Sequence, residues 1–153
     1  MLTIKNLRKR YGNFQALDGL NLEVADGELF GFVGPNGAGK TTTLKILAGL
    51  LVPDEGEVEI GGLDVYSDGK ELRRRIGYVP DHFGLYDNLK VSEYMEFFAA
   101  CYHLEGFEAR KRARNLLEQV GLGGRMDAFV DGLSRGMQQR LCLARALIHD
   151  PEL

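Results

Sequence analysis

The chain has 153 residues, of which 44% are hydrophobic and 27% charged, a composition that supports one domain with a buried core. Its formal net charge of −3 gives no electrostatic argument for nucleic acid as the main partner. The longest apolar run, from Leu44 to Val52, is too short to span a bilayer, and no apolar signal region opens the sequence. Cys101 and Cys142 lie far apart in helical patterns, so we expect buried thiols in a reducing cytosol and no disulfide.

Strand patterns come first along the chain. Leu2 to Lys9 alternates apolar and polar residues, which predicts an edge strand with a kink at Asn6. A second strand is expected from Leu17 to Val24, before the Asp26-Gly27 turn. The apolar run Leu29 to Val33 then predicts a short buried strand.

The next segment, from Gly34 to Thr41, fits the phosphate-loop pattern of Gly, four residues and Gly-Lys-Ser/Thr. A helix is expected from Thr41 to Leu47, closed by Gly49. A strand that enters a helix through glycines directs several backbone N–H groups and the positive end of the helix dipole at one point. The pattern therefore predicts a nucleoside triphosphate site. An empty glycine-rich turn would explain the loop alone, but not its place between a strand and a helix.

Each side chain of the loop has an expected role. The glycines allow positive φ and close approach of the backbone to phosphate oxygens. Lys40 is expected to contact the outer phosphates, the Thr41 hydroxyl to bind Mg²⁺, and Thr42 to add a donor to an inner phosphate. The residues expected to bind the nucleotide here are Gly34, Pro35, Asn36, Gly37, Ala38, Gly39, Lys40, Thr41 and Thr42.

After the loop, strands give way to helices. A short strand is expected at Glu57 to Ile60, a helical turn at Glu71 to Arg75, and a further strand at Ile76 to Val79, which runs into Pro80. Three helices follow: Glu93–Tyr102, capped by Ser92, with Tyr94, Phe97, Phe98 and Cys101 on its inner face; Phe107–Val120, stopped by Gly121; and Gly136–Ile148.

The start of the third helix carries a second candidate anion site. Ser134 offers a hydroxyl, Gly136 leaves the backbone open, and the helix N-terminus supplies free N–H groups. Taken alone, this segment is better explained as an ordinary N-cap. It stands, however, in a chain that also has a complete phosphate loop.

Together, these motifs resemble the nucleotide-binding domain of ATP-binding cassette (ABC) transporters. Leu133-Ser134-Arg135-Gly136-Met137 is similar to the family's Leu-Ser-Gly-Gly-Gln signature; Arg135 and Met137 depart from it, whereas Ser134 and Gly136 match. The residues from Gln138 to Pro151 are similar to the family's signature helix and its exit. Tyr11 matches the aromatic residue that stacks on adenine in such domains, although an edge-strand tyrosine also packs for structural reasons.

The resemblance implies a fold, ligands and partners. The fold would be α/β, a P-loop NTPase core with an N-terminal antiparallel β part and an all-helical subdomain, the C-terminal part of the core being missing. Residues 1–80 would form the core, 81–135 the helical subdomain and 136–153 the signature helix returning to the core. ATP and Mg²⁺ would bind between two such domains, with Ser134, Arg135 and Gly136 acting in trans. A transmembrane permease subunit would hold the protein at the inner face of the cell membrane, on the cytoplasmic side.

The resemblance implies that residues around Asp81 would contact the metal and the membrane partner. Asp81 stands where the family has glutamine; an aspartate there either binds Mg²⁺ or merely starts a turn after proline. His82 is expected to be an ordinary loop residue. Phe83, Leu85 and Tyr86 are expected either to contact the permease or to pack within the helical subdomain.

In the family, Asp-Pro leads into an apolar strand ending in Asp-Glu, which supplies the metal-supporting aspartate and the general base, with a switch histidine later. Here Asp150-Pro151 is followed only by Glu152 and Leu153. We therefore expect a truncated chain with no certain catalytic residue, which hydrolyses ATP poorly or not at all although the full-length parent is an ATPase. The open sheet edge beside Leu29 to Val33 is expected to lower stability or to promote self-association.

The sequence leaves two main functions open. The first is the ATP-hydrolysing subunit of a transporter. The second is a non-catalytic or regulatory nucleotide-binding dimerisation module, which the departures at Asp81, Arg135 and Met137 keep open. A soluble ABC ATPase acting on DNA or ribosomes is less well supported, because the segment between Pro80 and Leu133 is too short for the coiled coil of the DNA-repair type. The guanine-reading Asn-Lys-x-Asp motif of GTPases does not occur.

Overall fold

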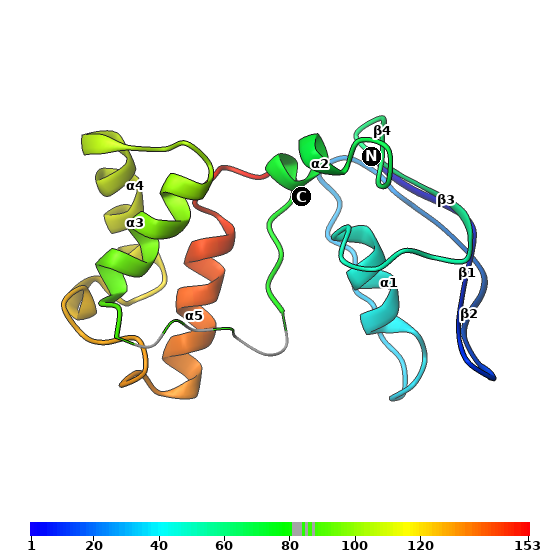
Figure 1. Ribbon diagram of the computed structural model, residues 1–153, viewed down its shortest axis with the longest axis horizontal. Coiled ribbons are helices and arrows are strands. Elements are labelled where there is room, and N and C mark those ends of the chain that lie inside the picture. The colour runs from blue at the N-terminus through cyan, green and yellow to red at the C-terminus, as the bar shows by residue number, and fades with distance from the viewer. Residues whose placement is uncertain (81–83, 85, 87) are drawn as a thin grey trace. The chain divides into compact units, whose positions relative to one another are not determined.

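The computed structural model describes residues 1–80, 84, 86 and 88–153 (Figure 1). The chain divides into two compact units, Met1–Arg73 and Arg74–Leu153. In the part that is described, no helix combines the length and the apolar character that crossing a membrane requires.

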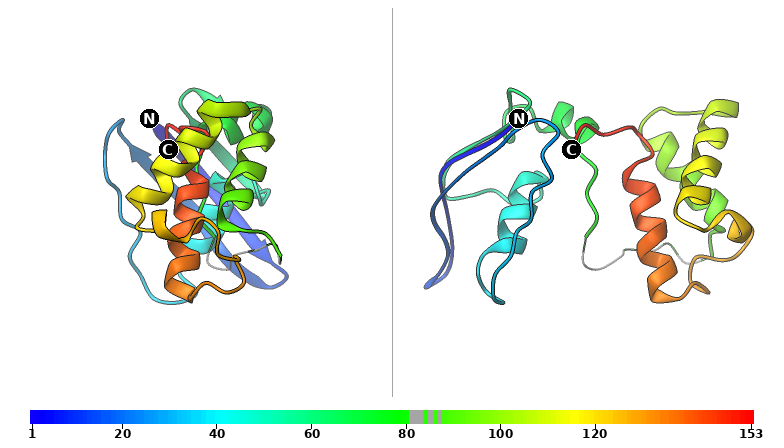
Figure 2. Two further views of the ribbon diagram at one scale, coloured as in Figure 1. Left: turned by 90° about the vertical axis from the view of Figure 1, so that its left-hand side faces the viewer. Right: turned by 180° about the vertical axis from the view of Figure 1, so that it is seen from behind.

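The first unit is built on a four-stranded antiparallel sheet with strand order β2-β1-β3-β4. Its strands are β1 (Leu2–Tyr11), β2 (Phe14–Val24), β3 (Glu55–Ile60) and β4 (Leu63–Asp64). The expectation that the first strand lies at an edge is wrong, because β1 pairs with β2 on one side and β3 on the other. An alternating pattern shows which face of a strand is buried and says nothing about its place in the sheet. Figure 2 shows β1 and β2 running side by side.

The kink predicted at Asn6 is confirmed. Asn6 has a φ of 47°, and the β1–β2 register shifts between Ile4 and Leu7. On the other side of β1, Gly56 has a φ of +104°, and a Cβ there would lie 2.6 Å from the Cα of Leu7. The bulge therefore brings two backbones so close that β3 needs a glycine opposite it.

Helix α1 (Lys40–Leu47) follows the phosphate loop, as predicted, and its Thr43, Ile46 and Leu47 are buried. Gly49, at φ +67°, ends the helix. Helix α2 (Gly69–Arg75) begins two residues before the predicted Glu71.

Two predicted strands do not form. Residues 29–33 join no strand in the part of the chain that the structure describes, and Leu29 and Val33 are 101% and 96% exposed. An apolar run becomes a buried strand only where neighbouring strands pair with it, and the described sheet, with the order β2-β1-β3-β4, does not include this segment.

The second missing strand is residues 76–79, which also lie outside any assigned strand. Its beginning nevertheless makes strand-like contacts. The Leu153 N–H donates to the Arg75 carbonyl (3.1 Å), and the Gly77 N–H donates to the Leu153 carbonyl (2.7 Å). This alternation is the hydrogen-bond pattern of parallel neighbours, here over a single residue.

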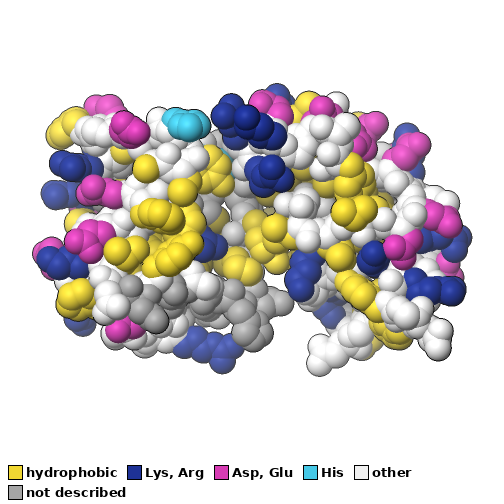
Figure 3. All heavy atoms as spheres, viewed as in Figure 1, with side chains coloured by type: hydrophobic (Ala, Val, Ile, Leu, Met, Phe, Trp, Pro, Cys, Tyr) yellow, Lys and Arg dark blue, Asp and Glu magenta, His cyan; other side chains and the backbone are white. Residues whose placement is uncertain are grey.

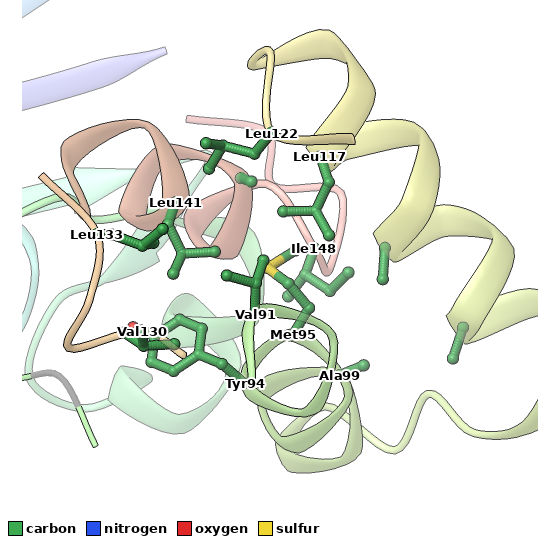
Figure 4. Packing of buried hydrophobic residues seen from close by; sticks show 13 residues of the cluster. Val91, Tyr94, Met95, Ala99, Leu117, Leu122, Val130, Leu133, Leu141 and Ile148 are labelled. Atoms are coloured by element: carbon green, nitrogen blue, oxygen red, sulfur yellow. The ribbon is translucent and has the colours of Figure 1, made fainter. Parts of the chain in front are cut away.

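The second unit packs its helices around one apolar core (Figure 4). The helices are α3 (Val91–Cys101), α4 (Gly106–Gln119), the 3₁₀ turn η1 (Gly123–Arg125) and α5 (Arg135–Ala146). Their bounds agree with the three predicted helices to within a few residues. The largest fully buried side chains of this core are Tyr94, Met95, Leu117, Leu122, Leu141 and Ile148.

The inner face of α3 differs from the prediction. Phe97 and Cys101 are exposed, and the buried residues of the helix are Val91, Tyr94, Met95 and Ala99. The helix begins at Val91, with Lys90 and not Ser92 as N-cap, and the Glu93 carboxylate accepts a hydrogen bond from the Lys90 N–H (2.8 Å). This start gives an inward stripe at i, i+3, i+4 and i+8.

Both cysteines are free thiols, as predicted, but only Cys142 is buried. Burial raises the pKa of the Cys142 thiol, so it stays protonated near neutral pH. It packs in the second unit as a small apolar side chain.

Candidate functional site

The phosphate loop leads into α1 through glycines with positive φ. Gly37 and Gly39 have φ values of +86° and +81°, and Gly39 is the N-cap of α1, which no side chain caps. The first N–H groups of a helix have no intrahelical acceptor, so this uncapped end offers donors to a ligand. A Cβ on Gly39 would lie 2.6 Å from the Ala16 carbonyl oxygen and 2.6 Å from Leu17 Cδ2. The loop is therefore pressed against β2 at a point where only glycine fits.

Lys40 is held over the loop. Its Nζ donates hydrogen bonds to the carbonyl oxygens of Gly34 (2.6 Å) and Pro35 (2.7 Å). The ammonium group is thus placed beside the uncapped N-terminus of α1, where both charges favour an anion.

Thr43 is an anchor that sequence reasoning missed. Its side chain is buried, and its hydroxyl donates to the Gly39 carbonyl (3.0 Å). The signal was available in the sequence, because a threonine four residues after the last loop glycine is placed to bond back to the i−4 carbonyl. The bond fixes the first turn of α1 to the loop.

The loop and the aromatic end of the first hairpin line one pocket of about 190 Å³. Its lining residues are Tyr11, Phe14, Ala16, Asn36, Gly37, Ala38, Gly39, Lys40, Thr41 and Thr42. Tyr11 ends β1, Phe14 begins β2, and each side chain is about half exposed, at 47% and 57%. The amide N–H groups and the ammonium group suit a polyphosphate, and the accessible aromatic faces suit a nucleobase joined to it. Phe14 was missed because no pattern in its own segment distinguishes it from a turn residue.

The second motif lies at the start of α5. Ser134 is the N-cap of the helix, and its Oγ accepts a long hydrogen bond from the Met137 N–H (3.4 Å). Ser134, Arg135 and Gly136 are all exposed, so the hydroxyl and the N-terminal amides face solvent. This geometry is both an ordinary N-cap and a surface to which an external anion has access.

Two arginines fix α5 within the second unit. Arg140 donates to the Val120 carbonyl at the end of α4 (3.0 Å). Arg145 Nη1 donates to the Tyr94 hydroxyl on α3 (3.0 Å), and its guanidinium lies 4.9 Å from the centre of the Phe98 ring. Burial raises the pKa of Tyr94 to about 12, so the hydroxyl stays protonated and accepts this bond as a neutral group.

Comparison with known proteins identifies the family. The model of the ABC transporter family matches residues 17–153. The chain belongs to the ABC transporter family. Its relatives include the Nod factor export ATP-binding protein I of Ralstonia nicotianae, 42% identical over 100% of this chain and 48% of the relative. The daunorubicin resistance ATP-binding protein DrrA3 of Streptomyces coeruleorubidus is 43% identical over 99% of this chain and 48% of the relative.

The fold is that of a P-loop NTPase core of the ABC type, and it matches part of the known cassettes. A dimeric structure of the ATP-binding cassette MJ0796, in a post-hydrolysis state bound to ADP and Pi, superposes with a TM-score of 0.87 at 34% identity. The match covers 99% of this ABC chain and 71% of that cassette. This chain spans 26% to 50% of the length of the curated relatives compared.

Part of the family's candidate site falls on residues 81–83, 85 and 87. The expected metal contact Asp81, together with His82, Phe83 and Leu85, lies outside the described residues. Of the predicted partner surface in this ABC chain, Tyr86 is described: it is 51% exposed, and its ring centre lies 5.3 Å from that of Phe97. Figure 3 shows hydrophobic side chains gathered over the helical unit that carries α3.

Proposed function

We propose that this chain binds ATP with Mg²⁺ and that the full-length protein is the ATP-binding subunit of an ABC transporter. The observation that supports this most directly is the pocket shared by Tyr11 and the phosphate loop. Tyr11 suits a nucleobase and the phosphate loop suits a polyphosphate, and both belong to the first unit.

Each residue of the pocket would act through its own chemistry. The amides of Gly37 and Gly39 and the first turn of α1 would donate to phosphate oxygens. Lys40 would exchange its two carbonyl acceptors for phosphate oxygens, a stronger charge-assisted contact. Thr41 would supply a hydroxyl ligand to Mg²⁺, and the bound ion would neutralise charge on the phosphates. Tyr11 would stack on adenine.

A second copy would complete the site. Ser134, Arg135 and Gly136 are exposed at the N-terminus of α5, and the cassette MJ0796 forms a dimer. We propose that these residues bind, in trans, the nucleotide held by the partner's phosphate loop, and that closure of the pair depends on it. Asp81 remains a proposed metal ligand.

At the level of the whole protein, we propose ATP hydrolysis coupled to transport. The relatives named above are an export and a drug-resistance ATP-binding protein. A transmembrane permease partner and a peripheral location on the cytoplasmic face of the cell membrane follow from this proposal.

The binding claim is tested by titrating a fluorescent ATP analogue against the wild-type chain and Lys40→Ala. Loss of a charged hydrogen-bond donor costs about 1.5–3 kcal/mol, so we expect affinity to fall roughly 10- to 100-fold. Lys45→Ala changes an exposed lysine on the same helix, so it is the control and should bind normally. Equal affinity of wild type and Lys40→Ala would refute the proposed site.

The departures at Arg135 and Met137 support a second candidate, a non-catalytic nucleotide-binding module that dimerises or regulates. Under this alternative, ATP would promote dimerisation of the full-length protein without turnover. Phosphate release measured together with sedimentation separates the two functions.

A further inference from the structure

A groove of about 490 Å³ lies in the second unit, and none of the residues that line it is assigned to nucleotide binding. It runs between α3 and α4. Its lining residues are Ser92, Glu96, Phe107, Arg110, Lys111, Ala113, Arg114, Leu117 and Met126. None of these residues belongs to the proposed nucleotide site, so the charge and polarity of the lining indicate what the groove binds.

One stripe of α4 forms the rim. Phe107, Arg110, Lys111 and Arg114 are spaced i, i+3, i+4 and i+7, so they lie on one face of the helix. Phe107 is 76% exposed, although it sits beside apolar lining residues of the groove. An exposed aromatic ring at the end of an apolar groove is the kind of anchor that interfaces use.

The charges of the rim are not balanced. Arg110 Nε lies 3.4 Å from Glu96 Oε1, a contact that joins α4 to α3. Lys111 and Arg114 are exposed and form no ion pair with any residue that the structure describes. The rim therefore carries two uncompensated positive charges above an apolar floor made by Ala113, Leu117 and Met126.

We propose that this groove docks an acidic amphipathic segment of a partner protein. Apolar side chains of the segment would fill the floor beside Phe107, and its carboxylates would pair with Lys111 and Arg114. The concave shape distinguishes this occupant from an anionic membrane, which presents a broad face to a basic helix and does not enter a groove.

The test uses fluorescence anisotropy of the whole chain with a labelled helical probe that has leucines at i, i+3, i+4 and i+7, flanked by glutamates. We expect saturable binding. Charge reversal in Lys111→Glu/Arg114→Glu, and separately Phe107→Ala, should each weaken binding by about tenfold or more. The control Lys45→Glu/Lys70→Glu makes the same change in net charge on exposed residues outside the groove and should bind as wild type does.

Three results would overturn the proposal: no binding of the glutamate probe by the wild-type chain, equal binding of a lysine-for-glutamate probe, or equal binding by the groove variants. Co-sedimentation with phosphatidylglycerol vesicles that depends on Lys111 and Arg114, in the absence of probe binding, would assign the surface to a membrane instead. Lys40→Ala should bind the probe normally, so failure here is distinguishable from failure of the nucleotide site. Circular dichroism of each variant verifies that α4 is intact.

Discussion

Three glycines of the phosphate loop differ in what an added methyl group would meet, and this predicts a graded series of stabilities. At Gly34, φ is not positive, and a Cβ would make an ordinary 3.4 Å contact with the Ala38 side chain. At Gly37, φ is +86° and nothing lies within 4 Å. At Gly39, φ is +81° and a Cβ would lie 2.6 Å from both the Ala16 carbonyl oxygen and Leu17 Cδ2.

These surroundings set the size of each effect in the ligand-free chain. Gly34→Ala should change the free energy of unfolding by no more than about 0.5 kcal/mol. Gly37→Ala adds only the cost of a left-handed alanine, about 1–2 kcal/mol. Gly39→Ala has the same backbone cost and an overpacking cost of about 1–3 kcal/mol against β2, a total of about 2–5 kcal/mol.

Urea unfolding followed by circular dichroism measures the series. At an m-value of about 1–3 kcal/mol/M, the midpoint of Gly39→Ala should fall by roughly 1 M or more, and that of Gly37→Ala by clearly less. If Gly39→Ala were no less stable than Gly37→Ala, the loop would not be pressed against β2, and this contact would not position the pocket.

Three further predictions concern the second unit. Burial lowers the pKa of His149, whose Nε2 lies 3.0 Å from the Ile76 carbonyl oxygen, so the unfolded state binds a proton more readily than the folded state. The free energy of unfolding should therefore fall as the pH drops below about 6.5. Urea unfolding at several pH values should show a smaller pH dependence in His149→Gln. Gly77→Ala should destabilise by about 1–3 kcal/mol in thermal unfolding, because a Cβ there would lie 2.6 Å from the Ala146 carbonyl oxygen; no change would contradict this packing. Tyr94→Phe should lower the free energy of unfolding in urea by about 1–3 kcal/mol, because it removes the hydroxyl that accepts a hydrogen bond from Arg145 of α5. Unchanged stability of this variant would show that the bond contributes little.

Local patterns predicted the elements whose signals are contained in their own residues. The phosphate loop, α1 and the three helices of the second unit were predicted because turn glycines and helical spacing act within a few residues. The strand at Leu29 to Val33 was wrong because strand formation depends on partners that its sequence does not specify. For the same reason, β1 was misplaced at an edge of the sheet.

The candidate site divides in a similar way. The loop residues were named from their motif, and Tyr11 from the family resemblance, whereas Phe14 emerged only from the folded hairpin. A division of the chain at residues 80 and 135 and the metal role of Asp81 stay predictions.

The central claim is that Tyr11 and the phosphate loop form one site, with the ring binding the base and Lys40 the phosphates. Calorimetric titration with Mg-ATP and, separately, with magnesium tripolyphosphate tests this directly. We expect Tyr11→Ala to weaken ATP binding by about 1–3 kcal/mol and to leave tripolyphosphate binding unchanged, while Lys40→Ala weakens the binding of both ligands. Equal loss of affinity for both ligands in Tyr11→Ala, or no loss for either, would show that Tyr11 does not bind the base.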